Sequence, residues 1–124
     1  MAKNLKVLAV DDDMINLKLL KSMLMKTDSV QEVIEARNGA DAINVLKERD
    51  DIDIILLDII MPVMGGIEML KVVRADENLK QLPIIVLTTD ETKKTEALEV
   101  GANGFLMKPV RAGDVAQKIA ELAL

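Results

Sequence analysis

The sequence predicts an α/β fold in which helices cover a five-stranded parallel sheet. Short apolar runs, continuous rather than alternating, recur at residues 7–10, 54–57 and 84–87. Continuous runs of this kind are typical of strands that are buried on both faces. Segments with the apolar spacing of helices lie between the runs, so that strand and helix alternate. Right-handed crossovers would then connect the parallel strands.

The elements of the first half follow in a regular order. Residues 7–10 form the first strand, and the helix after it has an inward apolar arc of Ile15, Leu19, Leu20, Met23 and Leu24. One more strand is needed before the second helix, and residues 33–36 fit it. The turn at Asn38 and Gly39 opens that helix, whose apolar positions are Ala42, Ile43 and Leu46.

The second half repeats this alternation. Strands are predicted at residues 54–57, 84–87 and 104–107, and the helix over residues 92–100 has few large apolar residues. Gly101 suits the end of that helix, because glycine readily adopts a positive φ. The third helix is predicted from the spacing of Ile67, Leu70, Val73 and Arg74. The last helix is predicted from the spacing of Val115, Ile119 and Leu122.

Composition excludes several classes of function. The 124 residues have the size of one compact domain, and we expect a single domain over 1–124 with no effector domain. The chain lacks cysteine and histidine, which excludes disulfide frameworks, thiolate metal sites and serine-type triads. A net charge of −5 argues against a nucleic-acid surface. The sequence has no targeting segment and no apolar span of about 20 residues, so we expect a cytoplasmic protein that does not contact membranes.

Polar residues stand at the ends of four predicted strands. The first strand is followed by three acids, the third by one, the fourth by two threonines and the fifth by a lysine. These residues are Asp11, Asp12 and Asp13, Asp58, Thr88 and Thr89, and Lys108. Ligands of open α/β sheets bind beyond the carboxyl ends of the strands. We therefore expect carboxylates, a hydroxyl and an ammonium to meet at one edge of the sheet.

These groups favour a site for magnesium and phosphate. Closely packed carboxylates repel one another unless a cation lies among them, and ligands that are all oxygen favour a hard cation. Mg²⁺ fits best because it accepts one or two carboxylates, waters and a phosphate oxygen; Mn²⁺ is the alternative. Lys108 would place its charge against the phosphate, and Thr88 would donate a hydrogen bond to it. Asp58 would be the nucleophile that forms an aspartyl phosphate.

Each of these residues also has a simpler interpretation. Asp13 precedes a helix, where aspartate is a common N-cap. Asp58 could be a solvated strand end, the threonines could reflect β-propensity, and Lys108 could be an ordinary loop lysine. The conjunction of polar residues at four strand ends favours the functional interpretation.

The sequence resembles the receiver domains of two-component response regulators, in particular the single-domain chemotaxis-type regulators. The resemblance covers nearly the whole chain. The segments that carry it are residues 10–13 (VDDD), 57–62 (LDIIMP), 65–66 (GG), 82–89 (LPIIVLTT), 101–102 (GA) and 105–109 (FLMKP). It implies a flavodoxin-like sheet of strand order 2-1-3-4-5, with helices on both faces. It also implies a signalling phosphoacceptor that catalyses its own phosphorylation and slow dephosphorylation, rather than a metabolic enzyme.

The resemblance implies a role for each site residue. Asp58 would accept a phosphoryl group from a phosphohistidine on a histidine kinase or phosphotransfer protein. Asp12 would bind Mg²⁺ directly and Asp11 directly or through water, and the backbone carbonyl of Ile60 would complete the protein ligands beside Asp58. Lys108 would contact the phosphoryl group, with a cis peptide bond to the proline that follows it.

The resemblance also implies a switch. Thr88 would swing toward the phosphoryl group, and Phe105, the only aromatic residue, would change rotamer with it. The helix over 92–100, the strand of Phe105 and the last helix would form an output face for a downstream protein that the sequence does not identify. Ile60 and Asp90 occupy the two positions at which the family tunes its own dephosphorylation, and we expect them to prolong the phosphoryl state.

A partner-docking face is expected on the first helix. If Ile15, Leu19 and Met23 face inward, helical geometry places four other side chains outward. These are Met14, Lys18, Lys21 and Met25. Exposed methionines flanked by lysines suit an adaptable surface for a partner helix bundle. Scattered surface residues are the simpler interpretation.

Three rival functions stay open at this point. A phosphohydrolase would use Asp11 and Asp13, but such enzymes need Thr or Ser soon after the second acid, and residues 14–17 (MINL) follow here. A phosphate-independent interaction module would not need Asp58, Thr88 and Lys108 together. A receiver excised from a hybrid kinase would keep the same chemistry.

Overall fold

The computed structural model describes residues 4–59, 61 and 64–123, and over these residues strands and helices alternate. The strands are β1 (Leu5–Val10), β2 (Val30–Ala36), β3 (Ile54–Asp58), β4 (Ile84–Thr88) and β5 (Gly104–Met107). The helices are α1 (Met14–Met25), α2 (Gly39–Glu48), α3 (Gly66–Ala75), α4 (Lys94–Val100) and α5 (Ala112–Ala123), and a 3₁₀ turn, η1 (Glu91–Lys93), precedes α4.

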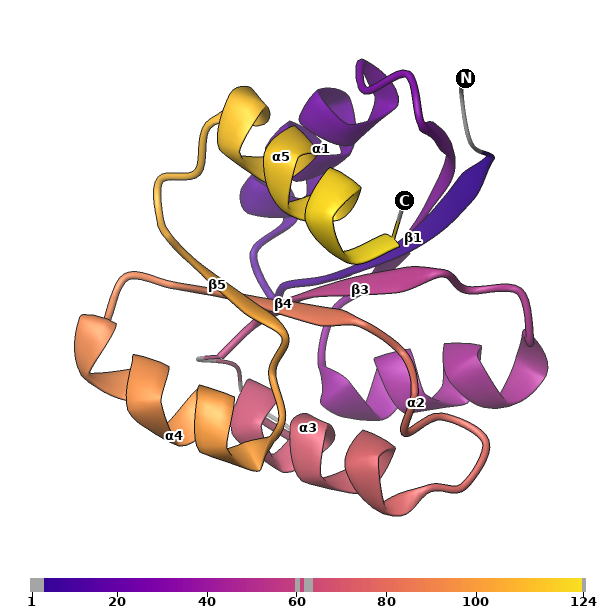
Figure 1. The fold of residues 1–124 in the computed structure, drawn as a ribbon, viewed down its shortest axis with the longest axis vertical. Helices are drawn as coiled ribbons and strands as arrows, with labels where there is room; N and C mark the ends of the chain where they lie inside the picture. The colour runs from indigo at the N-terminus through magenta and orange to yellow at the C-terminus, as the bar shows by residue number, and fades with distance from the viewer. Residues whose placement is uncertain (1–3, 60, 62–63, 124) are drawn as a thin grey trace.

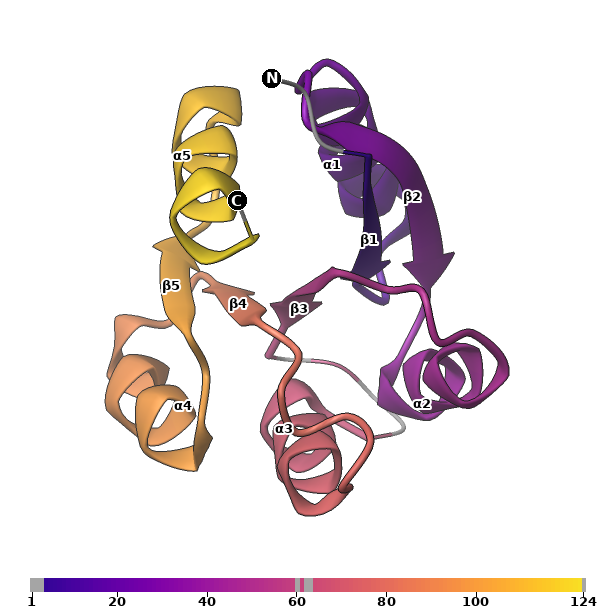
Figure 2. The ribbon, with the colours of Figure 1, turned by 45° about the vertical axis from the view of Figure 1, so that its right-hand side comes forward.

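The strands form one sheet in the order β2-β1-β3-β4-β5, and every neighbouring pair is parallel. Helices α1 and α5 cover one face, while α2, α3 and α4 cover the other (Figures 1 and 2). The predicted fold class and strand order are confirmed. Because the chain reverses direction across the sheet between β1 and β3, a crevice is expected beyond the ends of these two strands.

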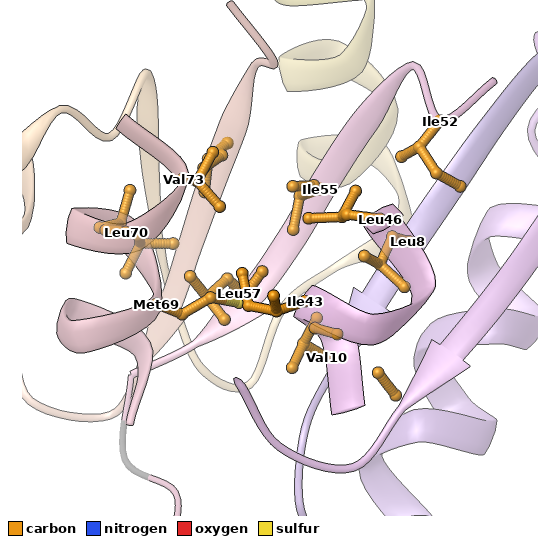
Figure 3. Packing of buried hydrophobic residues seen from close by; sticks show 14 of the residues in the cluster. Leu8, Val10, Ile43, Leu46, Ile52, Ile55, Leu57, Met69, Leu70 and Val73 are labelled. Atoms are coloured by element: carbon orange, nitrogen blue, oxygen red, sulfur yellow. The ribbon is translucent and has the colours of Figure 1, made fainter. Parts of the chain in front are cut away.

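Strand residues alternate between two hydrophobic clusters, one on each face of the sheet. Leu8, Val10, Ile55 and Leu57 point toward α2 and α3 and pack with Met69 (Figure 3). The residues between them, such as Val7 and Leu56, pack on the other face against α1 and α5. Side chains buried on both faces explain why these strands read as continuous apolar runs.

Several predicted elements differ in extent. The first strand begins at Leu5 rather than at residue 7, and the strands predicted at 54–57 and 84–87 each extend one residue further. The second strand begins at Val30 rather than at residue 33. The segment predicted as one helix over 92–100 divides into η1 and the seven-residue α4, because Asp90 caps a 3₁₀ turn first. Ala97 is the one buried residue of α4, and Gly101 ends the helix at φ +124°, as its position suggested.

The inward arc predicted for the first helix is wrong in part: Leu20 and Leu24 are buried as predicted, but Ile15 and Leu19 are not. Leu17, Leu20 and Leu24 face the sheet, whereas Ile15 is 71% and Leu19 is 56% exposed. Eight of the twelve residues of α1 are apolar, so the sequence pattern permits more than one buried arc, and packing against the sheet selects one of them. Among the described residues, no helix combines the length and apolar content that a membrane span requires.

Candidate functional site

The first two acids after β1 enter the site, and the third does not. Asp11 is 3% exposed, and its Oδ1 accepts the backbone N–H of Asp13 at 2.9 Å. Asp13 caps α1 by accepting the N–H groups of Ile15 and Asn16 at 2.8 and 3.4 Å. The N-cap interpretation of Asp13 is confirmed. Asp12, between them, is exposed.

Asp58 joins the two acids from the neighbouring strand. It is the last residue of β3 and is 6% exposed. One carboxylate oxygen from each of Asp11, Asp12 and Asp58 lies within 4.8 Å of the others. Gly66 permits a close approach below this acid, since a Cβ at that position would lie 2.5 Å from the backbone oxygen of Asp58. A set of three carboxylates at this spacing fits a hard divalent cation.

Lys108 brings the positive charge of the site. Its Nζ lies 2.8 Å from Oδ2 of Asp11 and 3.4 Å from Oδ1 of Asp58. Desolvation alone would lower the pKa of the Lys108 ammonium, but the hydrogen bond to Asp11 and the charge of Asp58 outweigh it and raise this pKa above its ordinary value. The ammonium is therefore charged at neutral pH. The peptide bond from Lys108 to Pro109 is cis, as the resemblance implied.

Thr88 lies at the end of β4, directly beside the strand of Asp58. Asp58 is paired with Leu87 across the two strands, so Thr88 lies one residue beyond this pair. Thr88 is 1% exposed, and its hydroxyl oxygen accepts the N–H of Asp90 at 3.1 Å. Its backbone oxygen accepts the N–H of Lys108 at 2.9 Å, which ties the end of β4 to the lysine of the site.

The other predicted functional residues surround this centre. Phe105 is half-buried in β5, and Nζ of Lys94 lies 5.7 Å from the centre of its ring. Asp90 does not extend freely into solvent, because its Oδ1 accepts from both the N–H and the hydroxyl of Thr92. These hydrogen bonds lower the pKa of the Asp90 carboxyl. Ile60 lies outside the described residues.

The four residues predicted for docking are all exposed on α1. Met14 and Met25 are each 49% exposed, and Lys18 and Lys21 are exposed between them. The Sδ atom of Met14 accepts a hydrogen bond from Arg37 at 3.7 Å, and Lys21 approaches Glu35 at 3.9 Å.

A groove beside Lys108 was not expected from the sequence. It measures about 300 Å³, and its lining includes Asn16, Leu19 and Met23 of α1 together with Pro109 and Val110. The arc predicted for the first helix places Leu19 and Met23 in the core, and a groove lined by these residues does not follow from it. Asn16 among apolar neighbours was the available signal that this side of the helix is not fully buried.

A family model for the response regulator receiver domain matches residues 7–120, which is most of the chain. The chain belongs to this family. The receiver domain is 35% identical over 122 residues to the chemotaxis protein CheY-3 of Vibrio cholerae, covering 97% of this chain and 92% of that protein. It is 31% identical over 120 residues to a CheY homologue of Campylobacter jejuni, covering 95% and 92% of the two chains.

Solved structures are similar over the same extent. Chemotaxis protein CheY4 of Vibrio cholerae aligns with a TM-score of 0.86 at 34% identity, covering 96% of this chain and 98% of that one. The receiver domain of a sensor histidine kinase from Pseudomonas aeruginosa aligns with a TM-score of 0.87 at 25% identity, covering 97% and 98%. That structure is described with a magnesium ion coordinated in its active-site cleft. This receiver domain is therefore a two-component signalling domain.

Proposed function

We propose that this receiver domain is a magnesium-dependent switch whose Asp58 accepts a phosphoryl group from a phosphohistidine. The observation that carries the proposal is the meeting of three carboxylates with one ammonium at the carboxyl edge of the sheet, where Lys108 lies between Asp11 and Asp58. With a divalent cation among the carboxylates, this arrangement would suit a carboxylate that must both attack phosphorus and tolerate the negative charge of the phosphoryl group.

In the transfer, a carboxylate oxygen of Asp58 attacks phosphorus and the phosphorus–nitrogen bond of the donor breaks. The electron pair of that bond leaves with the imidazole of the donor, and the product is an aspartyl phosphate. The ammonium of Lys108 stays near the transferred oxygens and balances their charge. Later hydrolysis by water would return Asp58 and release inorganic phosphate.

Magnesium would be held by Asp11, Asp12 and Asp58, with the backbone carbonyl of Ile60 as a further ligand. When bound, the ion neutralises developing charge on the phosphoryl oxygens. The oxygen-only donor set and the spacing of its atoms support this assignment. Asp11 already orders the loop through its bond to the N–H of Asp13, so its carboxylate is positioned before any ion arrives.

The switch would begin at Thr88. Its hydroxyl hydrogen is available to a phosphoryl oxygen, while its oxygen now accepts from Asp90. Movement of Thr88 toward Asp58 would replace its hydrogen bond with Asp90 by one with the phosphoryl group. This exchange would shift the conformational equilibrium of the segment that follows β4. Phe105, α4 and α5 form the proposed output face, on which Leu98 and Met107 are each 42% exposed.

The proposal is tested by intact mass after incubation with acetyl phosphate, with and without Mg²⁺. We expect a gain of one phosphoryl group in the wild type with Mg²⁺, and no gain in Asp58→Asn or in the presence of a chelator. No gain under any condition would support a phosphate-independent module. A gain in Asp58→Asn that is lost in Asp11→Asn would place the nucleophile after β1 and favour the hydrolase.

The phosphoryl state is proposed to be long-lived because of Ile60 and Asp90. An apolar side chain at residue 60 cannot orient an attacking water, and the Asp90 carboxylate carries charge of the same sign as the phosphate. We expect Ile60→Asn to shorten the half-life of the phosphorylated protein, measured as loss of the mass gain with time. Equal decay in the two proteins would contradict this role.

The donor is proposed to dock on the outer face of α1, formed by Met14, Lys18, Lys21 and Met25. The groove beside Lys108 adjoins this helix and would receive an apolar side chain of the donor's helix bundle. We expect Met14→Ala with Met25→Ala to slow phosphotransfer from a cognate histidine kinase but not from acetyl phosphate, which needs no docking. Unchanged transfer from the kinase would remove the docking role.

A further inference from the structure

The guanidinium of Arg74, in the last turn of α3, donates five hydrogen bonds to neutral oxygens. Nε and Nη2 donate to the backbone oxygen of Gly101 at 3.0 and 2.8 Å. Nη1 donates to the backbone oxygens of Lys80 and Leu82 at 3.0 and 2.8 Å, and Nη2 also donates to Oδ1 of Asn103 at 2.8 Å. Arginine has five N–H donors, so the whole guanidinium is used.

These bonds join three segments near the point where α4 ends: α3, residues 80–82 and residues 101–103. Asn103, which accepts from Arg74, also makes two hydrogen bonds with Ile84. Its Oδ1 accepts the N–H of Ile84 at 2.9 Å, and its own N–H donates to the backbone oxygen of Ile84 at 2.8 Å. Gly101 has φ +124°, and a Cβ there would lie 2.9 Å from Nε of Arg74. The C-terminal end of α4 therefore packs against the guanidinium of Arg74, and hydrogen bonds through Asn103 connect it to the starts of β4 and β5.

The N-terminal end of α4 is held very differently. Thr88 accepts the N–H of Asp90, and the Asp90 side chain caps η1 through Thr92. Residues 91 and 92 are exposed, as are residues 94–96, so few buried contacts reinforce these bonds. Beside the contact of Lys94 with the ring of Phe105, the hydrogen bonds that connect this end to the sheet therefore run through Thr88, the residue that the proposed phosphoryl group would move.

We propose that Arg74 is the fixed anchor of α4, so that a change at Thr88 moves the N-terminal end of the helix while its C-terminal end stays in place. The anchor itself does not depend on phosphorylation, but its use in signalling rests on the proposed function. A helix fixed at one end turns rather than detaches. The movement of α4 on the output face would then be a tilt about Gly101, with Asp90 as the link between Thr88 and η1.

The anchor is tested first in the unphosphorylated protein, by hydrogen exchange of single amides followed by NMR. In Arg74→Met we expect the amides of Gly101, Ala102 and Asn103 to exchange roughly tenfold faster or more, because several hydrogen bonds are lost together. The amides of Thr92 and Lys93 should keep their rates. In Asp90→Ala the pattern should be the reverse. Unchanged exchange at residues 101–103 in Arg74→Met would overturn the anchor.

Arg49→Met is the matched control, because it removes a guanidinium that also makes several hydrogen bonds, to Glu32 and Asp51. It should leave the amides of residues 101–103 unchanged. If Arg74→Met does not fold, Asn103→Ala removes one acceptor of the same cluster, and Arg74→Lys keeps the charge with fewer donors. Both should loosen the same amides to a smaller extent, and uniform loosening of the whole chain would contradict a local anchor.

The second test adds Mg²⁺ and beryllofluoride, a phosphoryl analogue, to the wild type and to Arg74→Met. In the wild type we expect altered exchange at Asp90, Thr92 and Lys93, with Gly101 to Asn103 unaffected. In Arg74→Met the change should spread to Gly101 and beyond. An equal response at both ends of α4 in the wild type would overturn the tilt. Failure of the phosphoacceptor role would appear separately, as an absent mass gain with acetyl phosphate while the first test still decides the anchor.

Discussion

Charged side chains are balanced at one end of the sheet's strands and unbalanced at the other. At the carboxyl edge, where the strands end, Asp11 and Asp58 share the ammonium of Lys108, and Asp12 is the third carboxylate of the cluster. At the amino edge, where the strands begin, Arg49 pairs with Glu32 and Asp51 at 3.0 and 2.9 Å. Lys6 pairs with the same aspartate at 3.1 Å, so two cations meet two anions there.

The comparison separates structure from function within one sheet. The balanced and only partly buried pairs at the amino edge add little free energy individually, and they leave no charge for a ligand. Three carboxylates against one cation at the carboxyl edge leave an excess of negative charge, which a divalent ion can relieve. An unbalanced cluster is tolerated where binding supplies the missing charge.

The largest effect is expected from Lys108→Met. Its loss leaves two carboxylates, each less than a tenth exposed as side chains, without their cation. We expect the free energy of unfolding to fall by about 3 kcal/mol in the presence of a chelator. Urea denaturation monitored by circular dichroism measures it. Lys80→Met is the control, since its pair with Glu77 is exposed and should contribute less than about 0.5 kcal/mol.

Magnesium should stabilise the wild type through the carboxyl edge. At a concentration of 100 times its dissociation constant, an ion that binds only the folded state adds about 2.7 kcal/mol to the free energy of unfolding. Asp12→Asn should reduce this gain. Asp13→Asn should retain it, because Asp13 is a helix cap and asparagine caps equally well. If both variants lose the gain alike, the assignment of Asp12 to the ion and Asp13 to the helix is wrong.

A side chain larger than glycine at residue 66, which packs against the backbone of Asp58, should destabilise the protein. In Gly66→Ala the new Cβ would lie 2.5 Å from the backbone oxygen of Asp58 and 2.7 Å from Cα of Ile59. We expect a loss of about 2 kcal/mol in thermal or urea unfolding, because backbone atoms must shift. Gly113→Ala meets nothing within 4 Å inside α5 and should instead stabilise by up to about 1 kcal/mol. Equal effects would mean that the close approach is not needed.

The smallest expected effect is a difference between Arg49→Met and Arg74→Met in how their loss of stability depends on pH. Hydrogen bonds from Arg49 lower the pKa values of Asp51 and Glu32, so their stabilisation is fully present above the ordinary pKa values near 4 and is lost progressively as pH falls from there toward the lowered folded-state values. The stability difference between wild type and Arg49→Met should therefore shrink from pH 6 to pH 3. Arg74 donates to carbonyl and amide oxygens, which do not titrate, so the corresponding difference for Arg74→Met should persist. Parallel curves for the two variants would remove the distinction.

Much of the site could be predicted because parallel strands bring their carboxyl ends to one edge. Asp11, Asp58 and Thr88 each follow a continuous apolar run, and Lys108 follows the shorter strand predicted at residues 104–107. Predicting where a strand ends therefore also predicts where its polar residue lies. Asp13 was ambiguous in sequence, since an acid before a helix can cap it or bind an ion. Its bonds to Ile15 and Asn16 resolve this in favour of the cap.

The sequence by itself determined the fold class, the order of elements and the residues at the carboxyl edge, because strand and helix periodicities and strand ends are local features. The tertiary structure alone decided the phase of α1, since its many apolar residues permit several arcs and only packing against the sheet selects Leu17, Leu20 and Leu24. Only the tertiary structure shows that the guanidinium of Arg74, whose sequence position resembles that of many helix residues, donates a hydrogen bond to the backbone oxygen of Gly101. Such contacts join residues far apart in the chain, and no local pattern encodes them.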